Sequence, residues 1–145
     1  MDIVVTTPRR AMKAAAAEAA AARAAADRGE RSRYFRRFPG TGAPVALRPG
    51  DWVWYVEDGA LRGRCRVVSI ASGLGRRCDT TGRPWPAGVY VEMDPRTWEW
   101  IEPAPLRGFQ GFRYFCRGAA ARWFGPGWRP RVVGGWRDPR PEAEP

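Results

Sequence analysis

The chain has 145 residues, of which 44% are hydrophobic, and its formal net charge is +10. This composition supports one domain with a buried core, and no apolar run approaches the roughly 20 residues that a membrane-spanning helix needs. The excess of positive charge favours an anionic partner such as nucleic acid. We expect no membrane association.

The three cysteines are Cys65, Cys78 and Cys116, an odd set without a CxxC pair. This pattern does not fit a disulfide scaffold and is typical of reduced thiols in a cytoplasmic protein. The opening MDIVVTTPRR lacks a basic region followed by a long apolar stretch, so we expect no signal peptide.

The first elements in chain order are a strand and a helix. Residues 2–6 contain three successive β-branched residues, which favour a strand. An alanine-rich helix is predicted from about residue 8 to residue 28, because alanine has the highest helix propensity. Thr7 is expected as its N-cap with Pro8 at the first helical position, and Gly29 ends it.

A β-hairpin is predicted next. Residues 32–38 are expected to be extended, and hydrophobic residues alternate along residues 51–57. Asp58-Gly59 is a strong signal for a two-residue hairpin turn, which would lead into a return strand over 61–70.

The second half of the chain is predicted to hold shorter strands. A loop over 71–87 leads to a strand at 89–94, which is expected to end in a turn at Asp94-Pro95. Two further strands are predicted at 98–101 and 108–116. From Arg117 the composition shifts to Gly, Pro, Arg and Trp, which indicates an irregular arm over 117–145. The predicted class is α+β, with the N-terminal helix packed on a small barrel.

Four stretches carry a resemblance: IVVTTP before the helix, YFRRF after it, RPGDWVWYVEDGALRG across the hairpin and PLRGFQGFRYF near the end. Together they resemble the PUA-like superfamily, in particular small bacterial and phage proteins of the ASCH type. The resemblance covers most of residues 1–116, departs in the alanine-rich helix and omits the arm. It implies a PUA-like or SH3-like barrel that binds RNA or DNA, in some branches by holding a flipped or modified base in an aromatic pocket.

Three groups of polar and aromatic residues are the candidate nucleic-acid contacts. Guanidinium groups pair with phosphates, a helix N-terminus offers free N–H groups, and aromatic faces stack on bases. For each group the alternative is structural: helix capping, core aromatics with a solvated rim, or a barrel-closing strand. The groups are Thr6, Thr7, Arg9 and Arg10 at the helix start, Arg33, Tyr34, Arg36 and Arg37 after the helix, and Arg107, Gln110, Arg113 and Tyr114 near the end.

Tryptophan is frequent, with eight residues. Trp54 and Trp85 are candidate stacking residues, although strand spacing favours the core for at least half of Trp52, Trp54, Trp98 and Trp100. Trp123, Trp128 and Trp136 alternate with arginines, which fits either a nucleic-acid clamp or an arm that docks on the barrel.

The sequence does not predict an enzyme. The chain contains no histidine, no HxE or CxxC zinc motif, and no GxxxxGK[ST] or GxGxxG phosphate loop. We assign no catalytic residue, metal or cofactor. Two alternatives to nucleic-acid binding stay open: an interaction or assembly protein, phage-encoded, that docks on an acidic protein surface, and a weak metal-free ribonuclease.

Overall fold

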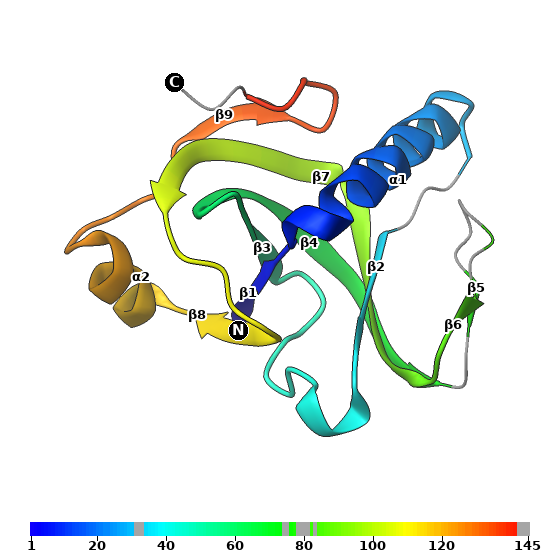
Figure 1. Cartoon of the computed structure of the whole chain (residues 1–145), viewed down its shortest axis with the longest axis horizontal. Helices are drawn as coiled ribbons and strands as arrows, with labels where there is room; N and C mark the ends of the chain where they lie inside the picture. Colours follow the sequence, from blue (N-terminus) through cyan, green and yellow to red (C-terminus); the bar gives the residue numbers. More distant parts are fainter. Residues whose placement is uncertain (31–33, 74–75, 78–81, 83, 142–145) are drawn as a thin grey trace.

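The computed structural model describes residues 1–30, 34–73, 76–77, 82 and 84–141, without the side chains of residues 76, 77 and 85. It is an α+β fold in which a mixed sheet curls into a half-barrel that carries two helices (Figure 1). In the described part of the chain, neither helix is long and apolar enough to cross a membrane. The elements are β1 Asp2–Thr6, α1 Arg9–Asp27, β2 Tyr34–Phe38, η1 Gly40–Gly42, β3 Trp52–Glu57, β4 Ala60–Gly73, β5 Arg76–Arg77, β6 Pro84–Trp85, β7 Gly88–Pro105, β8 Phe112–Phe115, α2 Arg117–Phe124 and β9 Val132–Gly135.

The main sheet has the strand order β2-β7-β4-β3-β1-β8, and β9 pairs with the second half of β7. β1 pairs in parallel with β3 and antiparallel with β8. Successive residues of β1 point to opposite faces of the sheet, and Ile3, Val4 and Val5 are all fully buried. β1 is therefore a central strand that is covered on both sides.

Two hydrophobic clusters lie on the two sides of β1. Ile3 and Val5 belong to the first cluster, against which Tyr34, Tyr55 and Trp98 pack. Val4 belongs to the second, which α2 covers with Ala119 and Ala120 among others. α1 lies across the sheet face of the first cluster and packs against β7, with only Ala22 and Ala25 buried among its residues.

The predicted helix and hairpin are confirmed. α1 spans Arg9–Asp27, and β3 and β4 pair antiparallel across the Asp58-Gly59 turn. Both turn residues adopt positive φ, at 50° and 70°, as the turn that matches the strand twist requires. The expected cap is wrong: Pro8 is the N-cap without a side-chain hydrogen bond, and the N–H of Thr7 donates to the carbonyl of Val56 at 2.9 Å.

The expected turn at Asp94-Pro95 is also wrong, because β7 runs without a break from Gly88 to Pro105. Proline has no N–H for the ladder, and the pairing with β4 shifts register at this point. The Asp94 carbonyl instead accepts hydrogen bonds from the Cys65 thiol at 3.0 Å and the Thr97 hydroxyl at 2.6 Å. These contacts let the strand bend where the sequence predicts that it stops.

The described part of the predicted arm, which the composition indicates to be partly irregular, contains two regular elements. These are α2 and β9, and Trp123 stacks on Phe115 with ring centroids 5.6 Å apart and an interplanar angle of 15°. The ring centroid of Trp128 lies 4.6 Å from that of Phe124 and 6.3 Å from that of Trp54. Two of the arm's tryptophans therefore fix α2 to the second cluster. The final strand is shorter than predicted, at Phe112–Phe115.

Candidate functional site

The end of β1 brings together parts of all three predicted contact groups. The Oγ1 of Thr6 accepts a hydrogen bond from the N–H of Phe109 at 3.1 Å, and the Thr6 carbonyl accepts one from Nη2 of Arg36 at 3.3 Å. A Cβ on Gly108 would lie 2.9 Å from the Thr6 methyl, so only glycine lets the loop approach this closely. The loop that carries Arg107 and Gln110 is thereby held beside the start of α1.

The cations at this edge differ in how far they are neutralised. Arg9 pairs with Asp58 at 3.2 Å. Arg10 and Arg107 are exposed and have no carboxylate partner in the described ranges, and Gln110 is also exposed. The guanidinium of Arg113 lies 4.4 Å from the ring centroid of Phe109. The edge therefore offers unpaired positive charge beside a hydrogen-bonding amide.

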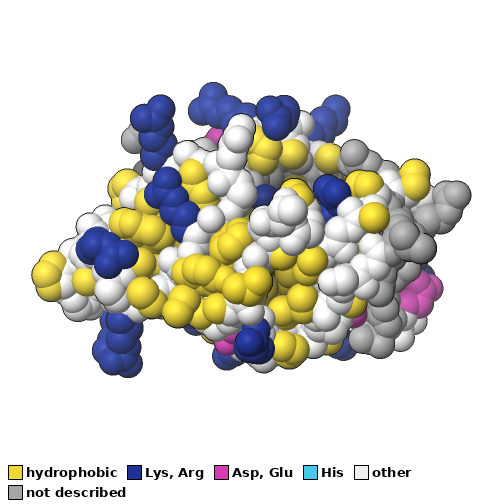
Figure 2. All heavy atoms as spheres, turned by 90° about the horizontal axis from the view of Figure 1, so that it is seen from below, with side chains coloured by type: hydrophobic (Ala, Val, Ile, Leu, Met, Phe, Trp, Pro, Cys, Tyr) yellow, Lys and Arg dark blue, Asp and Glu magenta, His cyan; other side chains and the backbone are white. Residues whose placement is uncertain are grey.

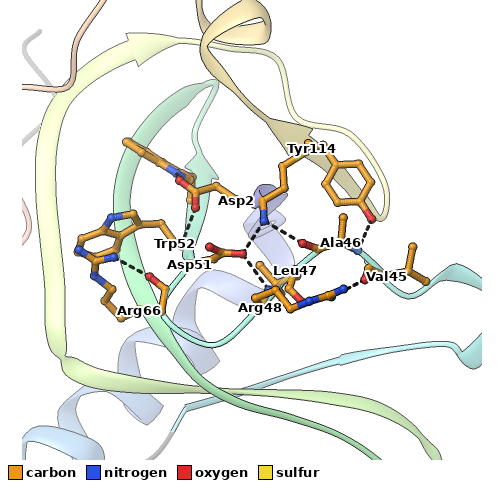
Figure 3. A network of polar contacts seen from close by, with 12 residues as sticks. Asp2, Val45, Ala46, Leu47, Arg48, Asp51, Trp52, Arg66 and Tyr114 are labelled. Atoms are coloured by element: carbon orange, nitrogen blue, oxygen red, sulfur yellow. Dashed lines mark hydrogen bonds and ion pairs between the residues drawn. The ribbon is translucent and has the colours of Figure 1, made fainter.

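Other predicted contacts have structural roles. Arg37 donates to the Ala87 carbonyl at 2.9 and 2.7 Å, and the Tyr114 hydroxyl accepts from the N–H of Ala46 at 3.0 Å (Figure 3). Trp54 is 4% exposed and donates to the Asp2 carboxylate at 3.0 Å, which places its indole in the core. Arg33 and the side chain of Trp85 lie outside the described residues.

On the face that Figure 2 shows, the positive charge is not gathered into one patch. Figure 2 shows a face whose centre is largely hydrophobic, with many Lys and Arg side chains standing at its margin. Many guanidiniums are paired with carboxylates, which lowers the local potential. Among the described residues, ion pairs join Arg9 to Asp58, Arg28 to Glu30, Arg64 to Glu99, Arg96 to Asp94, Arg131 to Glu102, Arg137 to Asp27, and Arg140 to Glu57 and Asp58.

A pocket of about 420 Å³ lies between α1 and the sheet. Its helix side is mostly alanine, with Ala11, Ala15 and Ala19 among others, together with the longer side chains of Met12, Glu18 and Arg23. Alanine methyl groups cannot fill the space between a helix and a sheet as leucine would, so the hollow follows from the alanine-rich sequence of α1. The opposite wall is aromatic and consists of Tyr34, Tyr55, Trp98, Trp100 and Trp136.

The aromatic wall is built around Trp98. Its ring centroid lies 4.9 Å from that of Trp100 and 5.3 Å from that of Tyr55. Gly63 of β4 lies beneath the indole, and a Cβ there would come within 2.2 Å of it. The indole N–H of Trp98 is buried and has no hydrogen-bond partner in the described part of the chain. This N–H is sealed from solvent, so it is an unsatisfied donor of the core and not a contact that the pocket offers to a ligand.

Among the described residues, the pocket lining contains three guanidiniums and three carboxylates, which belong to Arg23, Arg36, Arg140, Glu18, Glu57 and Asp138. Burial raises the pKa of Glu57, and the nearby guanidiniums of Arg140, at 3.4 Å, and Arg62 oppose that shift. Arg23 donates to the carbonyl of Trp136 at 3.4 Å, and Arg36 also lines the pocket. Burial raises the pKa of the Tyr34 hydroxyl.

Of the predicted contacts, Thr7, Tyr34 and Arg36 line this pocket. Trp136 belongs to the predicted arm, and Arg23 and Arg140 are not among the predicted contacts. The signal that could have found the pocket is the pairing of an alanine-rich helix face with a Trp-rich strand. No group of three or more Cys, Asp or Glu residues that could hold a metal ion occurs among the described residues.

A second hollow, of about 370 Å³, lies beside α2 and is lined by Pro103, Trp123 and Trp128 among others. Its aromatic rings are the ones that anchor α2, so the first pocket is the better candidate site. Comparison of the chain with protein-family models, curated proteins and solved structures finds no match in any of the three.

Proposed function

We propose that the protein binds single-stranded nucleic acid, RNA or DNA, and holds one unstacked base in the pocket between α1 and the sheet. The observation that carries this proposal is a pocket of about 420 Å³ with a wall of Tyr and Trp rings. Pockets of this size take small ligands, and base–aromatic stacking contributes about 1–3 kcal/mol per base.

The pocket is continuous with the basic edge at the end of β1. Arg36 lines the pocket and also donates to the carbonyl of Thr6, and Thr7 and Pro8 lead from the pocket to the cations of α1. A base in the pocket would leave its phosphates near Arg36, Arg10 and Arg107. Phosphate contacts fix the position of the strand, and the pocket supplies the discrimination.

The half-barrel with its helix is compatible with a PUA-like fold. We propose this fold and a cytoplasmic location together with the function. Because the cations are dispersed, we expect few phosphate contacts and a shallow salt dependence. Each neutralised phosphate of a single strand contributes about 0.7 to the slope of log K against log salt concentration.

The test is a fluorescence anisotropy titration of labelled single-stranded RNA, single-stranded DNA and duplex DNA at two salt concentrations. We expect both single strands to bind more tightly than the duplex, because a base must leave its stack to enter the pocket. Equal affinity for duplex and single strand, or no binding at low salt, would refute the proposal. Full-length RNA recovered after incubation, with and without chelator, would separate binding from ribonuclease activity.

Two charge-matched variants make the test specific to the pocket. Arg36→Gln removes a guanidinium that lines the pocket, whereas Arg28→Gln removes one that pairs with Glu30 beyond the last turn of α1. We expect Arg36→Gln to weaken binding by about tenfold, since a charged hydrogen bond contributes about 1.5–3 kcal/mol. Arg28→Gln should have little effect, and an equal loss in both variants would indicate binding by net charge alone.

A further inference from the structure

The C-terminal strap, residues 132–141, closes one end of the pocket. Its first part is β9, which pairs with β7 through Gly135 opposite Glu99 and Gly134 opposite Trp100. A tight turn follows, in which the N–H of Asp138 donates to the Gly135 carbonyl at 3.0 Å. The turn brings the strap to the end of the pocket, beside α1 (Figure 1), where its lining residues are Trp136, Asp138, Pro139 and Arg140.

The strap is tied to both sides of the pocket by polar contacts. Arg140 reaches Glu57 at 3.4 Å and Asp58 at 3.2 Å on the sheet side. Arg137 reaches Asp27 of α1 at 3.1 Å, and both of these side chains are more than half exposed. The Arg137–Asp27 pair is exposed, so it is weak, is screened by salt and can open at little cost. The pairs of Arg140 are more shielded, since the Glu57 side chain is only 14% exposed, and they are the stronger tie of the strap.

The strap's two hydrogen bonds to the pocket wall are long. Nε1 of Trp100 donates to the Asp138 carbonyl at 3.3 Å, and Nη1 of Arg23 donates to the Trp136 carbonyl at 3.4 Å. The segment before the strap is held differently, because Trp123 and Trp128 pack into the second hydrophobic cluster. β9 itself is held to β7 by ladder pairing, so the weakly attached part of the strap begins after Gly135.

We propose that the strap is a gate that admits the ligand and then forms part of its binding site. The strap lifts to admit the base and closes with Trp136 against the base and Arg140 near its phosphate. This inference rests on the proposed function for the identity of the ligand. The opening itself follows from the contacts of the strap and is testable without a ligand.

The ligand-free test compares amide hydrogen exchange of residues 132–138 in the full-length protein and in two variants. Arg140→Gln removes the pairs with Glu57 and Asp58, and Arg28→Gln is the charge-matched control whose pair with Glu30 does not touch the strap. We expect several-fold faster exchange of the strap in Arg140→Gln and in the native protein at high salt, and no change in Arg28→Gln. Unchanged strap exchange in Arg140→Gln would overturn the gate.

The ligand test measures the association rate of a labelled single-stranded oligonucleotide by stopped flow. Removing a positive charge slows association with a polyanion when charge steering alone acts. A gate held shut by Arg140 predicts the opposite change in the association rate, because removing Arg140 opens the pocket. We therefore expect Arg140→Gln to raise both the association rate and the dissociation rate. Arg28→Gln should leave both rates unchanged or lower.

A slower association in Arg140→Gln would overturn the gate even if exchange is faster. If no oligonucleotide binds the native protein, the proposed function fails. Whether the strap opens is then tested by the exchange experiment together with acrylamide quenching of the pocket tryptophans. Quenching should increase in Arg140→Gln and not in Arg28→Gln.

Discussion

The hydroxyl of Thr6 accepts a hydrogen bond at 3.1 Å from the N–H of Phe109, a residue 103 positions later in the chain. This bond, with the close approach of Gly108, holds the 106–111 loop against the end of β1. It is the reason why residues from three separate stretches of the sequence lie at one edge of the molecule.

Replacing Thr6 by valine keeps the shape of the side chain and removes the acceptor. The N–H of Phe109 then loses its partner, and we expect the free energy of unfolding to fall by about 1 kcal/mol. Hydrogen exchange at the Phe109 amide should also become faster. Thr7→Val is the matched control, because the Thr7 hydroxyl has no hydrogen-bond partner within the described ranges; equal losses in both variants would contradict this account.

Gly63 is predicted to be essential for the position of Trp98. A Cβ at this site would lie 2.2 Å from the indole, so Gly63→Ala must displace the ring or bend β4. We expect a loss of about 1–3 kcal/mol in chemical denaturation. Gly73→Ala, also on β4, meets no atom within 4 Å and should be nearly neutral; a comparable loss there would point to backbone effects instead.

Two cysteines are predicted to differ sharply in reactivity. The backbone N–H groups of Ala119 and Gly118 at the start of α2, together with Arg122, lower the pKa of the exposed Cys116 thiol. Burial raises the pKa of Cys65 to about 12. Because the thiolate is the reactive form, iodoacetamide at pH 7–8 should modify Cys116 quickly and leave Cys65 intact in the folded protein.

Peptide-level mass spectrometry measures both cysteines in one sample. Arg122→Gln should slow the modification of Cys116, since it removes one of the charges that favour the thiolate. Equal labelling of Cys65 and Cys116 under native conditions is the outcome that would reject the prediction.

Glu57 gives the protein a specific pH dependence. Its pKa is raised above the ordinary value of 4.5, chiefly by burial, so the folded protein holds this proton more tightly than the unfolded chain. The contribution of Glu57 to stability therefore declines as the pH rises from about 4.5 through the raised pKa. Arg140→Gln removes the guanidinium that opposes the shift, so the pKa should rise further and the decline should extend to higher pH.

Denaturation across a pH series and an NMR titration of the Glu57 carboxyl would measure this effect. In a Glu57→Gln background the added pH dependence of Arg140→Gln should disappear. A Glu57 titration that is identical with and without Arg140 would show that the ion pair does not form in solution.

Local rules predict part of the fold well. The alanine run and the Asp58-Gly59 turn need only neighbouring residues to specify α1 and the β3–β4 hairpin, and both form as expected. The turn at Asp94-Pro95 fails for a tertiary reason. The Cys65 thiol and the Thr97 hydroxyl satisfy the Asp94 carbonyl, and the strand continues past the proline.

The candidate site was less predictable, because its parts come from distant positions. Tyr34, Trp98 and Trp136 share one pocket wall although they lie on β2, β7 and the strap. Sequence patterns identify aromatic and basic residues but not which of them will face one another. Trp54 shows the same limit, since strand alternation could not tell that its face is covered by α2 and Trp128.

At the inner face of α1, the stability of the protein and its ability to bind a ligand are in conflict. An enclosed cavity destabilises a protein by about 24 cal/mol per Å³ of empty space. This pocket is open to solvent and costs less, but a larger side chain that fits against its apolar wall would still bury additional apolar surface. Ala15→Leu would extend a side chain into the hollow opposite the tryptophans and should raise the melting temperature. The same leucine would occupy the volume that a base needs. The most stable variant of the protein should therefore also be the one that no longer binds a base in the pocket.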